Sequence, residues 1–325
     1  LERAREVGIE RMEEYSRRPH ASPGATSEEL VAELLALKAR YPTLGPKKLS
    51  VMMQGRIEQR TAGRILKRHG LTCASRNPPE TCCSFERAYP NELWQMDFKG
   101  LKRRPPRYEV LSVVDDATRR LIALQAIPNQ QLETFWPVLW EAFGEYGLPD
   151  SILTDNGASF RCFATWRLSR MDVLLIRLGI HPAHGRPYHP QTQGKVERFH
   201  RTLQDHAKGN LIQNSITEVQ PILDDFHSFY DWIRPHESIG QRPPGTIYAS
   251  SKRSRPSQIP EVTYESRVAV RKVCKGGFFK FKGEEYRAGK GLIGEPVGIC
   301  QNEVDGEFTV YFGTYRLGLL RECAP

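Results

Sequence analysis

The sequence predicts an α/β protein in which a helical region precedes a mixed-sheet core and a small β-barrel follows it. Three patterns support this prediction: short helical patterns before residue 71, buried strands mixed with helices from residue 92, and short strands separated by glycine turns after residue 260. The expected division is a helical region at 1–71, a linker at 72–91, the core at 92–250, a second linker at 251–260 and the barrel at 261–325.

The helical region is expected to contain three helices. Thr26 and Glu29 have the spacing of a capping box, which predicts that the first helix starts there. The second and third helices are expected at Lys47–Met53 and Glu58–His69. If Ile65 and Leu66 face the core, the third helix exposes four basic side chains: Arg60, Arg64, Lys67 and Arg68. This pattern is typical of a helix-turn-helix that enters a DNA groove, and also of a small bundle with a solvated basic face.

The core is predicted from strands and helices that follow one another along the chain. Its expected strands are Leu93–Phe98, Tyr108–Val114, Arg120–Ile127 and Ser151–Thr154. Its expected helices are Leu132–Tyr146, about 164–178, one that carries Glu197, and 215–235. Residues 181–192 are expected to form a loop rich in proline and histidine. The aromatic residues of the last helix are expected to pack on the core: Phe226, Phe229, Tyr230 and Trp232. The connection between the first two strands is strongly basic and contains Lys102, Arg103 and Arg104.

Three carboxylates stand where a shared metal site is expected. Asp97 lies in the first core strand, Asp155 directly follows the fourth, and Glu197 lies on a basic helix. An aspartate in an otherwise apolar strand is costly unless it is paired or binds a metal ion. Mg²⁺ prefers hard oxygen ligands, and two such ions can hold both oxygens of an in-line phosphodiester displacement. The pattern therefore predicts a site for two Mg²⁺ or Mn²⁺ ions that acts on nucleic acid.

Each of these carboxylates also has a purely structural interpretation. Asp97 fits a strand end, Asp155 fits the turn formed by Asp-Asn-Gly, and Glu197 fits a surface pair with Arg201. The basic side chains around Glu197, namely Lys195, Arg198 and Arg201, favour a phosphate-binding role for this helix.

Other polar residues near the three carboxylates are expected to support the fold. Asp115 and Asp116 compete as metal ligands, but their place directly before Ala-Thr-Arg favours a turn or a cap. His184, His189 and His200 are expected to be loop or supporting residues.

Composition favours a nucleic-acid partner over a membrane. The net charge is +9, and the excess of basic residues extends over all parts of the chain, although a generic basic surface would give the same balance. No apolar run is long enough to cross a bilayer, and no signal peptide opens the sequence. The seven cysteines form no C-x-x-C pair, which indicates reduced thiols in a cytoplasmic protein. Because residue 1 is Leu and not Met, further residues are expected before it.

Four motifs occur in a fixed order along the core. They are W-x-x-D-F (94–98), V-V-D-D-x-T-R (113–119), L-T-D-N-G (153–157) and P-Y-H-P-Q-T-Q-G-K-V-E-R-F-H-R-T-L (187–203). This series resembles the catalytic core of retroviral-integrase-like transposases of bacterial insertion sequences, and the flanking regions are similar as well. The resemblance implies an RNase H-like core in which Asp97, Asp155 and Glu197 form the metal-binding D-D-E set. It also implies DNA contacts at Lys195 and Arg198.

The implied activity is that of a DDE transposase, which cleaves DNA at transposon ends and transfers the 3′-OH into target DNA. Its implied partners are double-stranded DNA and further copies of the chain in a dimer or larger assembly, in the bacterial cytoplasm beside the nucleoid. The alternatives are a catalytically inactive DNA-binding regulator and a nuclease that cleaves without joining.

Two features depart from the family pattern. Asp155 and Glu197 are separated by 41 residues, a longer interval than is usual, and the extra residues are expected around 161–171. The first residues resemble the tail of an earlier helix-turn-helix, so we expect part of an end-recognition module to lie outside this sequence.

Overall fold

The computed structural model describes residues 24–72, 86–100, 108–154, 168–185, 194–207, 211 and 215–321; at positions 194, 196 and 197 it describes the backbone alone. Contacts between residues divide the chain into two compact units, Leu1–Ala74 and Ser75–Pro325. Across the described ranges, we find no helix that is both long and apolar enough to cross a membrane.

The first unit contains the three predicted helices: α2 (Glu28–Arg40), α3 (Pro46–Met52) and α4 (Gln59–Arg68). The predicted start of α2 is one residue early, because Ser27 and not Thr26 is the N-cap. The backbone of Ser27 is extended, and its hydroxyl accepts a hydrogen bond from the amide of Leu30 at 3.4 Å. Ile65 and Leu66 of α4 are buried, as predicted. The four basic side chains predicted on its outer face are exposed: Arg60, Arg64, Lys67 and Arg68.

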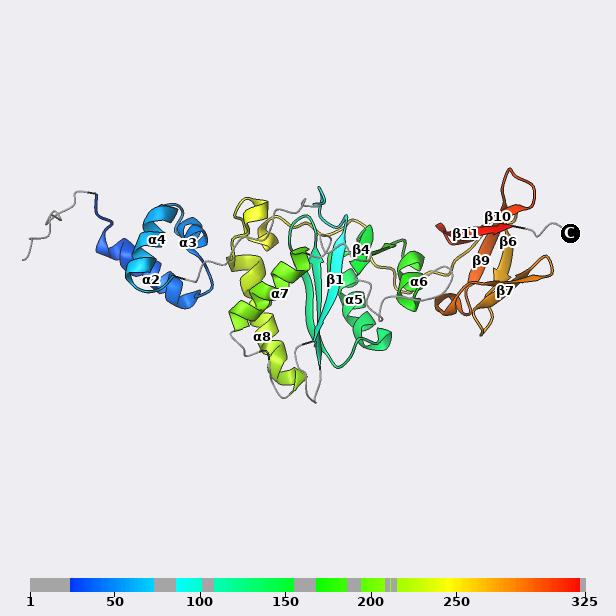
Figure 1. Cartoon of the computed structure of the whole chain (residues 1–325), viewed down its shortest axis with the longest axis horizontal. Helices are drawn as coiled ribbons and strands as arrows, with labels where there is room; N and C mark the ends of the chain where they lie inside the picture. The colour runs from blue at the N-terminus through cyan, green and yellow to red at the C-terminus, as the bar shows by residue number, and fades with distance from the viewer. Residues whose placement is uncertain are drawn as a thin grey trace, which may run out of the picture. The chain divides into compact units, whose positions relative to one another are not determined.

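The second unit is built on a five-stranded mixed sheet (Figure 1). Its strands are β1 (Trp94–Gly100), β2 (Glu109–Asp115), β3 (Leu121–Ile127), β4 (Ser151–Thr154) and β5 (His181–His184), in the order β3-β2-β1-β4-β5. The first three strands are antiparallel, whereas β4 is parallel to both β1 and β5. This sheet confirms the predicted mixed-sheet α/β core and places β1 at its centre.

Strand β5 corrects the sequence prediction, which assigned these residues to a loop. His181, Pro182 and His184 give no strand signal, but β5 lies at the sheet edge and pairs on one side, with β4. An edge strand tolerates a proline because one row of its backbone groups has no ladder partner.

Helices lie on both sides of this sheet (Figure 1). They are α5 (Leu132–Tyr146), α6 (Arg170–Arg177), α7 (Gly194–Ala207) and α8 (Ile216–Ser228), followed by the short helical turns η3 (Phe229–Ile233), η4 (Glu237–Ile239) and η5 (Pro244–Thr246). Helix α6 starts later than predicted, because Ser169 and Asp172 form a capping box at its first turn.

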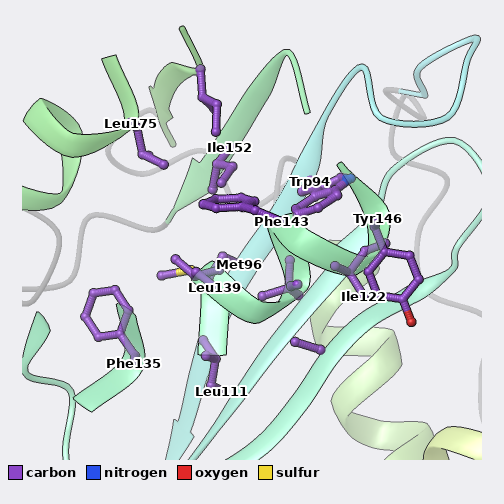
Figure 2. Close-up of a cluster of buried hydrophobic side chains, with 14 of the residues drawn as sticks. Trp94, Met96, Leu111, Ile122, Phe135, Leu139, Phe143, Tyr146, Ile152 and Leu175 are labelled. Atoms are coloured by element: carbon purple, nitrogen blue, oxygen red, sulfur yellow. The ribbon is translucent and has the colours of Figure 1, made fainter. Parts of the chain in front are cut away.

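The main apolar core lies between β1, α5 and α6. Trp94 of β1 stacks on Phe143 of α5 with ring centroids 5.8 Å apart, and Met96 and Leu139 are buried beside them (Figure 2). Successive side chains of a strand point to opposite faces of the sheet. Since Trp94 and Met96 face this core, Asp97 belongs to the other face of β1.

Trp232 differs from the prediction that it packs on the core. Its neighbours Phe226, Phe229 and Tyr230 are buried as predicted, whereas Trp232 is 56% exposed. The Trp232 ring instead covers the guanidinium of Arg120, 4.9 Å from its centroid. A surface cation–π contact therefore replaces burial at this position.

The segment 251–260, predicted as a linker, lies against the core. Arg253 donates hydrogen bonds to the carbonyl oxygens of Leu178 and Gly179 at 3.1 and 2.6 Å, and so binds the chain just past the end of α6. Gly147 has φ +77°, and a Cβ there would come within 2.7 Å of the Ser251 carbonyl oxygen. Glycine thus permits this close approach at the end of α5.

The C-terminal β-domain forms two antiparallel sheets around one apolar core. Its elements are β6 (Ala269–Lys272), β7 (Phe278–Phe281), β8 (Glu284–Arg287), η6 (Lys290–Leu292), β9 (Pro296–Gln301), β10 (Glu307–Phe312) and β11 (Tyr315–Arg321). The larger sheet has the order β11-β10-β9-β6, and β7 pairs with β8. Val173 and Ile176 of α6 belong to the same apolar cluster, so α6 packs against both the mixed sheet and the β-domain.

Candidate active site

Asp97 lies at the centre of the mixed sheet, where the pairing of β1 with β4 ends. Met96 pairs with Thr154, the last residue of β4, and Asp97 pairs on its other side with Ser112 of β2. The Asp97 side chain is 26% exposed, and its Oδ1 accepts a hydrogen bond from the amide of Phe98 at 2.9 Å. Asp155 follows Thr154 in the sequence and lies outside the described residues.

Helix α7 brings a buried histidine to this carboxylate. His200 Nδ1 lies 3.5 Å from Asp97 Oδ2, and His200 Nε2 lies 3.0 Å from the Ser112 hydroxyl. Burial, followed by the positive charge of Lys99, lowers the pKa of His200 to about 3, so the ring is neutral at pH 7.

The neutral ring has one N–H, and the surroundings decide which nitrogen carries it. A carboxylate only accepts hydrogen bonds, so the N–H is assigned to Nδ1, which faces Asp97. Nε2 then accepts from the Ser112 hydroxyl, whose other acceptor, the Asp97 carbonyl oxygen, is more distant at 3.3 Å. His200 therefore lies beside the Asp97 carboxylate as a neutral ring.

The position of α7 also determines where the backbone of residue 197 lies. Residue 197 precedes His200 by three positions, and helix positions three apart lie on the same side. The helical backbone at position 197 is therefore on the side of α7 that contacts β1. The side chain of Glu197 lies outside the described part of the chain.

Asp115 and Asp116 stabilise the turn after β2, as the sequence predicts. Both are buried, and Asp115 accepts hydrogen bonds from the amide and hydroxyl of Thr118 at 2.8 and 2.6 Å. Asp116 accepts from the side chains of Gln95 at 2.5 Å and Lys195 at 2.6 Å. Asp116 thus joins the β2–β3 turn to β1 and to the start of α7.

The predicted DNA contacts occupy different environments. The ammonium of Lys195 is bound to Asp116, and burial lowers the pKa of Lys195 while the hydrogen bond opposes that shift. Arg198 and Arg201 are exposed on the same helix. The three basic residues of the β1–β2 connection, Lys102, Arg103 and Arg104, lie outside the described residues.

The donor chemistry at Asp97 suits a hard cation such as Mg²⁺, because a partly exposed carboxylate at the end of a strand pairing offers oxygen ligands. Within the described ranges, no three His, Cys, Asp or Glu side chains form a group that could hold a metal ion. Asp97 is the one member of the predicted D-D-E set whose side chain is described.

Two relationships at this site were not predicted from the sequence. The pairing of Lys195 with Asp116 joins residues 79 positions apart, and no local pattern reports it. His200 was expected to have a supporting role, but its contact with Asp97 depends on how α7 crosses β1. The spacing Glu-x-x-His was the available signal, since it places both residues on one helix side.

Comparisons with known proteins define the class. Residues 87–190 and 178–244 each match the integrase core domain, and residues 268–320 match the C-terminal domain of IS481 family transposases. Residues 87–244 are therefore similar to integrase core domains and residues 268–320 to an IS481-type transposase C-terminal domain, which confirms the resemblance found in the sequence.

Two curated relatives come from bacterial insertion elements. The chain is 25% identical over 218 residues to an uncharacterized 39.2 kDa protein of insertion element IS476 from Xanthomonas euvesicatoria, which covers 66% of this chain and 58% of the relative. It is 25% identical over 193 residues to a putative transposase of element IS5376 from Geobacillus stearothermophilus, over 57% of this chain and 46% of that protein. The chain thus spans about half the length of these relatives.

Two solved viral structures align with the chain. A simian T-cell lymphotropic virus intasome, solved in complex with PP2A regulatory subunit B56 gamma, aligns with 90% of this chain and 99% of its own at 17% identity and a TM-score of 0.46. The HTLV-2 integrase catalytic core in complex with magnesium aligns with 50% of this chain and 99% of its own at 19% identity and a TM-score of 0.39.

Proposed function

We propose that the protein is a DDE transposase that cleaves DNA at the ends of a mobile element and joins the freed 3′-OH to target DNA. One observation supports this most directly: Asp97 on the central strand contacts α7, the helix that carries Glu197. The neighbouring strand β4 ends beside Asp97 and leads directly to Asp155. The end of β4 and helix α7 thus both lie beside Asp97, in the middle of β1.

The proposed reaction has two phosphoryl transfers. In the first, water attacks the phosphorus at the element end, and the 3′ oxygen leaves with a proton. In the second, this 3′-OH attacks a phosphorus of target DNA, and the 3′ oxygen of the target strand leaves. The number of phosphodiester bonds is unchanged in the second step.

Asp97, Asp155 and Glu197 would hold the metal ions in both steps. When bound, two Mg²⁺ or Mn²⁺ ions would stabilise the attacking and leaving oxygens of the displacement. The neutral ring of His200, with Nδ1 3.5 Å from Asp97 Oδ2, would limit the orientations open to this carboxylate.

DNA would contact basic surfaces on both units. Arg198 and Arg201 extend from α7 beside the site, and Arg60, Arg64, Lys67 and Arg68 extend from α4. Lys195 and the basic connection with Lys102, Arg103 and Arg104 complete the proposed set. Both element ends must be joined together, so the acting species would be a dimer or a larger assembly, in the bacterial cytoplasm beside the nucleoid.

A joining assay tests this proposal. The full chain is incubated with Mg²⁺ or Mn²⁺, a supercoiled target plasmid and duplexes that carry the terminal sequences flanking its gene, either intact or already cut. We expect cleavage of intact ends and joining of cut ends, and both reactions should stop with EDTA. Cleavage without joining would support the nuclease alternative, and binding without either reaction would support the inactive regulator.

The charge on α4 predicts a specific effect on DNA binding. Arg64→Ala and Arg68→Ala are each expected to lower the salt dependence of DNA binding. The slope of log K against log salt concentration should become shallower by about 0.9 for every phosphate that the variant no longer neutralises. Binding of an end duplex is measured by fluorescence anisotropy between 50 and about 200 mM salt. Arg56→Ala is the matched control, because Arg56 pairs with Glu33 outside α4. Unchanged slopes in both α4 variants would remove this helix from the DNA interface.

A further inference from the structure

The end of β4 is bound to β5 by a side-chain contact as well as by the strand pairing. Thr154 pairs with His184 in the parallel ladder, and the amide of Gly185 donates to the Thr154 carbonyl oxygen at 3.1 Å. The Thr154 hydroxyl lies 3.0 Å from His184 Nδ1. A histidine thus holds the last residue before Asp155.

The opposite nitrogen of the same ring faces α6. His184 Nε2 lies 3.3 Å from Asp172 Oδ1, and Asp172 is completely buried. The other Asp172 oxygen accepts from the amide of Ser169 at 2.7 Å, in the capping box of α6. Neither His184 Nε2 nor Asp172 Oδ1 has a hydrogen-bond partner in the described part of the chain. Because buried polar atoms need a partner, we pair these two atoms with each other.

The position of the buried Asp172 carboxylate indicates which nitrogen of the His184 ring carries the proton. Asp172 can only accept, so Nε2 carries the hydrogen that faces it, and Nδ1 accepts from the Thr154 hydroxyl. The Thr154 hydroxyl is thus hydrogen-bonded to the imidazole of His184, and the opposite nitrogen of that ring lies in close contact with Asp172. This arrangement connects the end of β4 to the start of α6.

A threonine, a histidine and an aspartate in a row also occur in nucleophilic catalysis. Here Thr154 is 2% exposed, so a substrate cannot reach its hydroxyl. These three residues therefore control the position of the end of β4 and do not act on a substrate.

We infer that His184 is a positioning residue for the proposed metal site: it fixes the end of β4, from which the chain continues to Asp155, against the start of α6. The inference rests on the proposed function, because it assumes that Asp155 binds metal. Residues that hold a metal ligand in place typically change metal affinity by about 10- to 100-fold when they are replaced.

Mn²⁺ binding to the full chain provides a readout that does not require catalysis. The free Mn²⁺ signal is titrated by electron paramagnetic resonance for wild type, His184→Ala, Thr154→Val and Thr154→Ser. We expect His184→Ala and Thr154→Val to weaken Mn²⁺ binding about 10-fold or more, and Thr154→Ser, which keeps the hydroxyl, to bind as wild type does. The double variant His184→Ala/Thr154→Val should be no weaker than the weaker single variant, since both remove the same connection.

Two controls separate this inference from a folding defect and from the proposed function. His181→Ala removes an exposed imidazole from the same strand and should leave Mn²⁺ affinity unchanged. Thermal unfolding identifies any variant that fails to fold, and the Thr154→Val and Thr154→Ser variants, each of which differs from wild type by one small group, then carry the test. Wild-type affinity in His184→Ala and Thr154→Val, with loss of binding in Asp97→Asn, would overturn the inference and leave the proposed function standing. Wild-type affinity in Asp97→Asn as well would overturn both.

Discussion

Asp97→Asn is expected to lower metal-dependent DNA cleavage about 1,000-fold or more while DNA binding is retained. The substitution keeps the shape of the side chain and removes the charge that would hold the metal ions, and a loss of about 4 kcal/mol of transition-state stabilisation gives this factor. Cleavage and joining of end duplexes are measured with Mg²⁺ and with Mn²⁺. Binding of the same duplexes is measured by fluorescence anisotropy.

The matched control is Asp224→Asn, which changes an exposed aspartate on α8 whose partner is the Gln220 side-chain amide. It should cleave at the wild-type rate. Cleavage by Asp97→Asn within a few-fold of wild type would contradict a catalytic role for this carboxylate, and loss of duplex binding would show that the substitution acts through the fold.

Asp116→Ala is expected to lower the free energy of unfolding by about 3 kcal/mol, because it removes one partner of a buried ion pair. Asp116 is 1% exposed, and its loss leaves the Lys195 ammonium and the Gln95 amide without their acceptor. The measurement is urea-induced unfolding followed by circular dichroism, with the midpoint and slope compared between variants.

Two controls test whether burial is the cause. Lys195→Met removes the ammonium, but Asp116 still accepts hydrogen bonds from the backbone amide of Arg87 and the side-chain amide of Gln95. Lys195→Met should therefore destabilise the protein less than Asp116→Ala. Arg267→Ala breaks an exposed pair with Glu265 and should leave the unfolding midpoint unchanged. A wild-type midpoint for Asp116→Ala would contradict the assignment of Asp116 as the buried link between the β2–β3 turn and α7.

Much of the fold could be predicted because its signals are local. The helices α2, α3 and α4 follow from turn residues and from apolar positions at helical spacing, and Ile65 and Leu66 were assigned to the correct side of α4. Strands β1 to β4 and helix α5 follow in the same way, because burial of whole elements is visible in the order of apolar residues. Strand β5 could not be found, since its pairing with β4 compensates for a sequence without strand preference.

The candidate site was predictable in its residue types more than in its contacts. The free-energy cost of a carboxylate in an apolar strand identifies Asp97 from the sequence. The structure places His200 next to Asp97, in agreement with the supporting role expected of His200. Lys195 was assigned to DNA, and the structure directs its ammonium to Asp116. Free basic side chains and paired ones have the same sequence signal, because a partner that is distant along the chain leaves no local pattern.

The order of residues along this chain predicts a division into three parts, a mixed-sheet core and the carboxylates proposed to bind metal, and the structure confirms the mixed sheet. Tertiary structure alone decides which polar groups meet: Ser112 with His200 across 88 positions, Thr154 with His184 across 30, and Lys195 with Asp116 across 79. The physical reason is that periodicity reports only whether a side chain is buried. Which buried groups become neighbours depends on strand register and on how helices cross the sheet, and these are set by packing of the whole core.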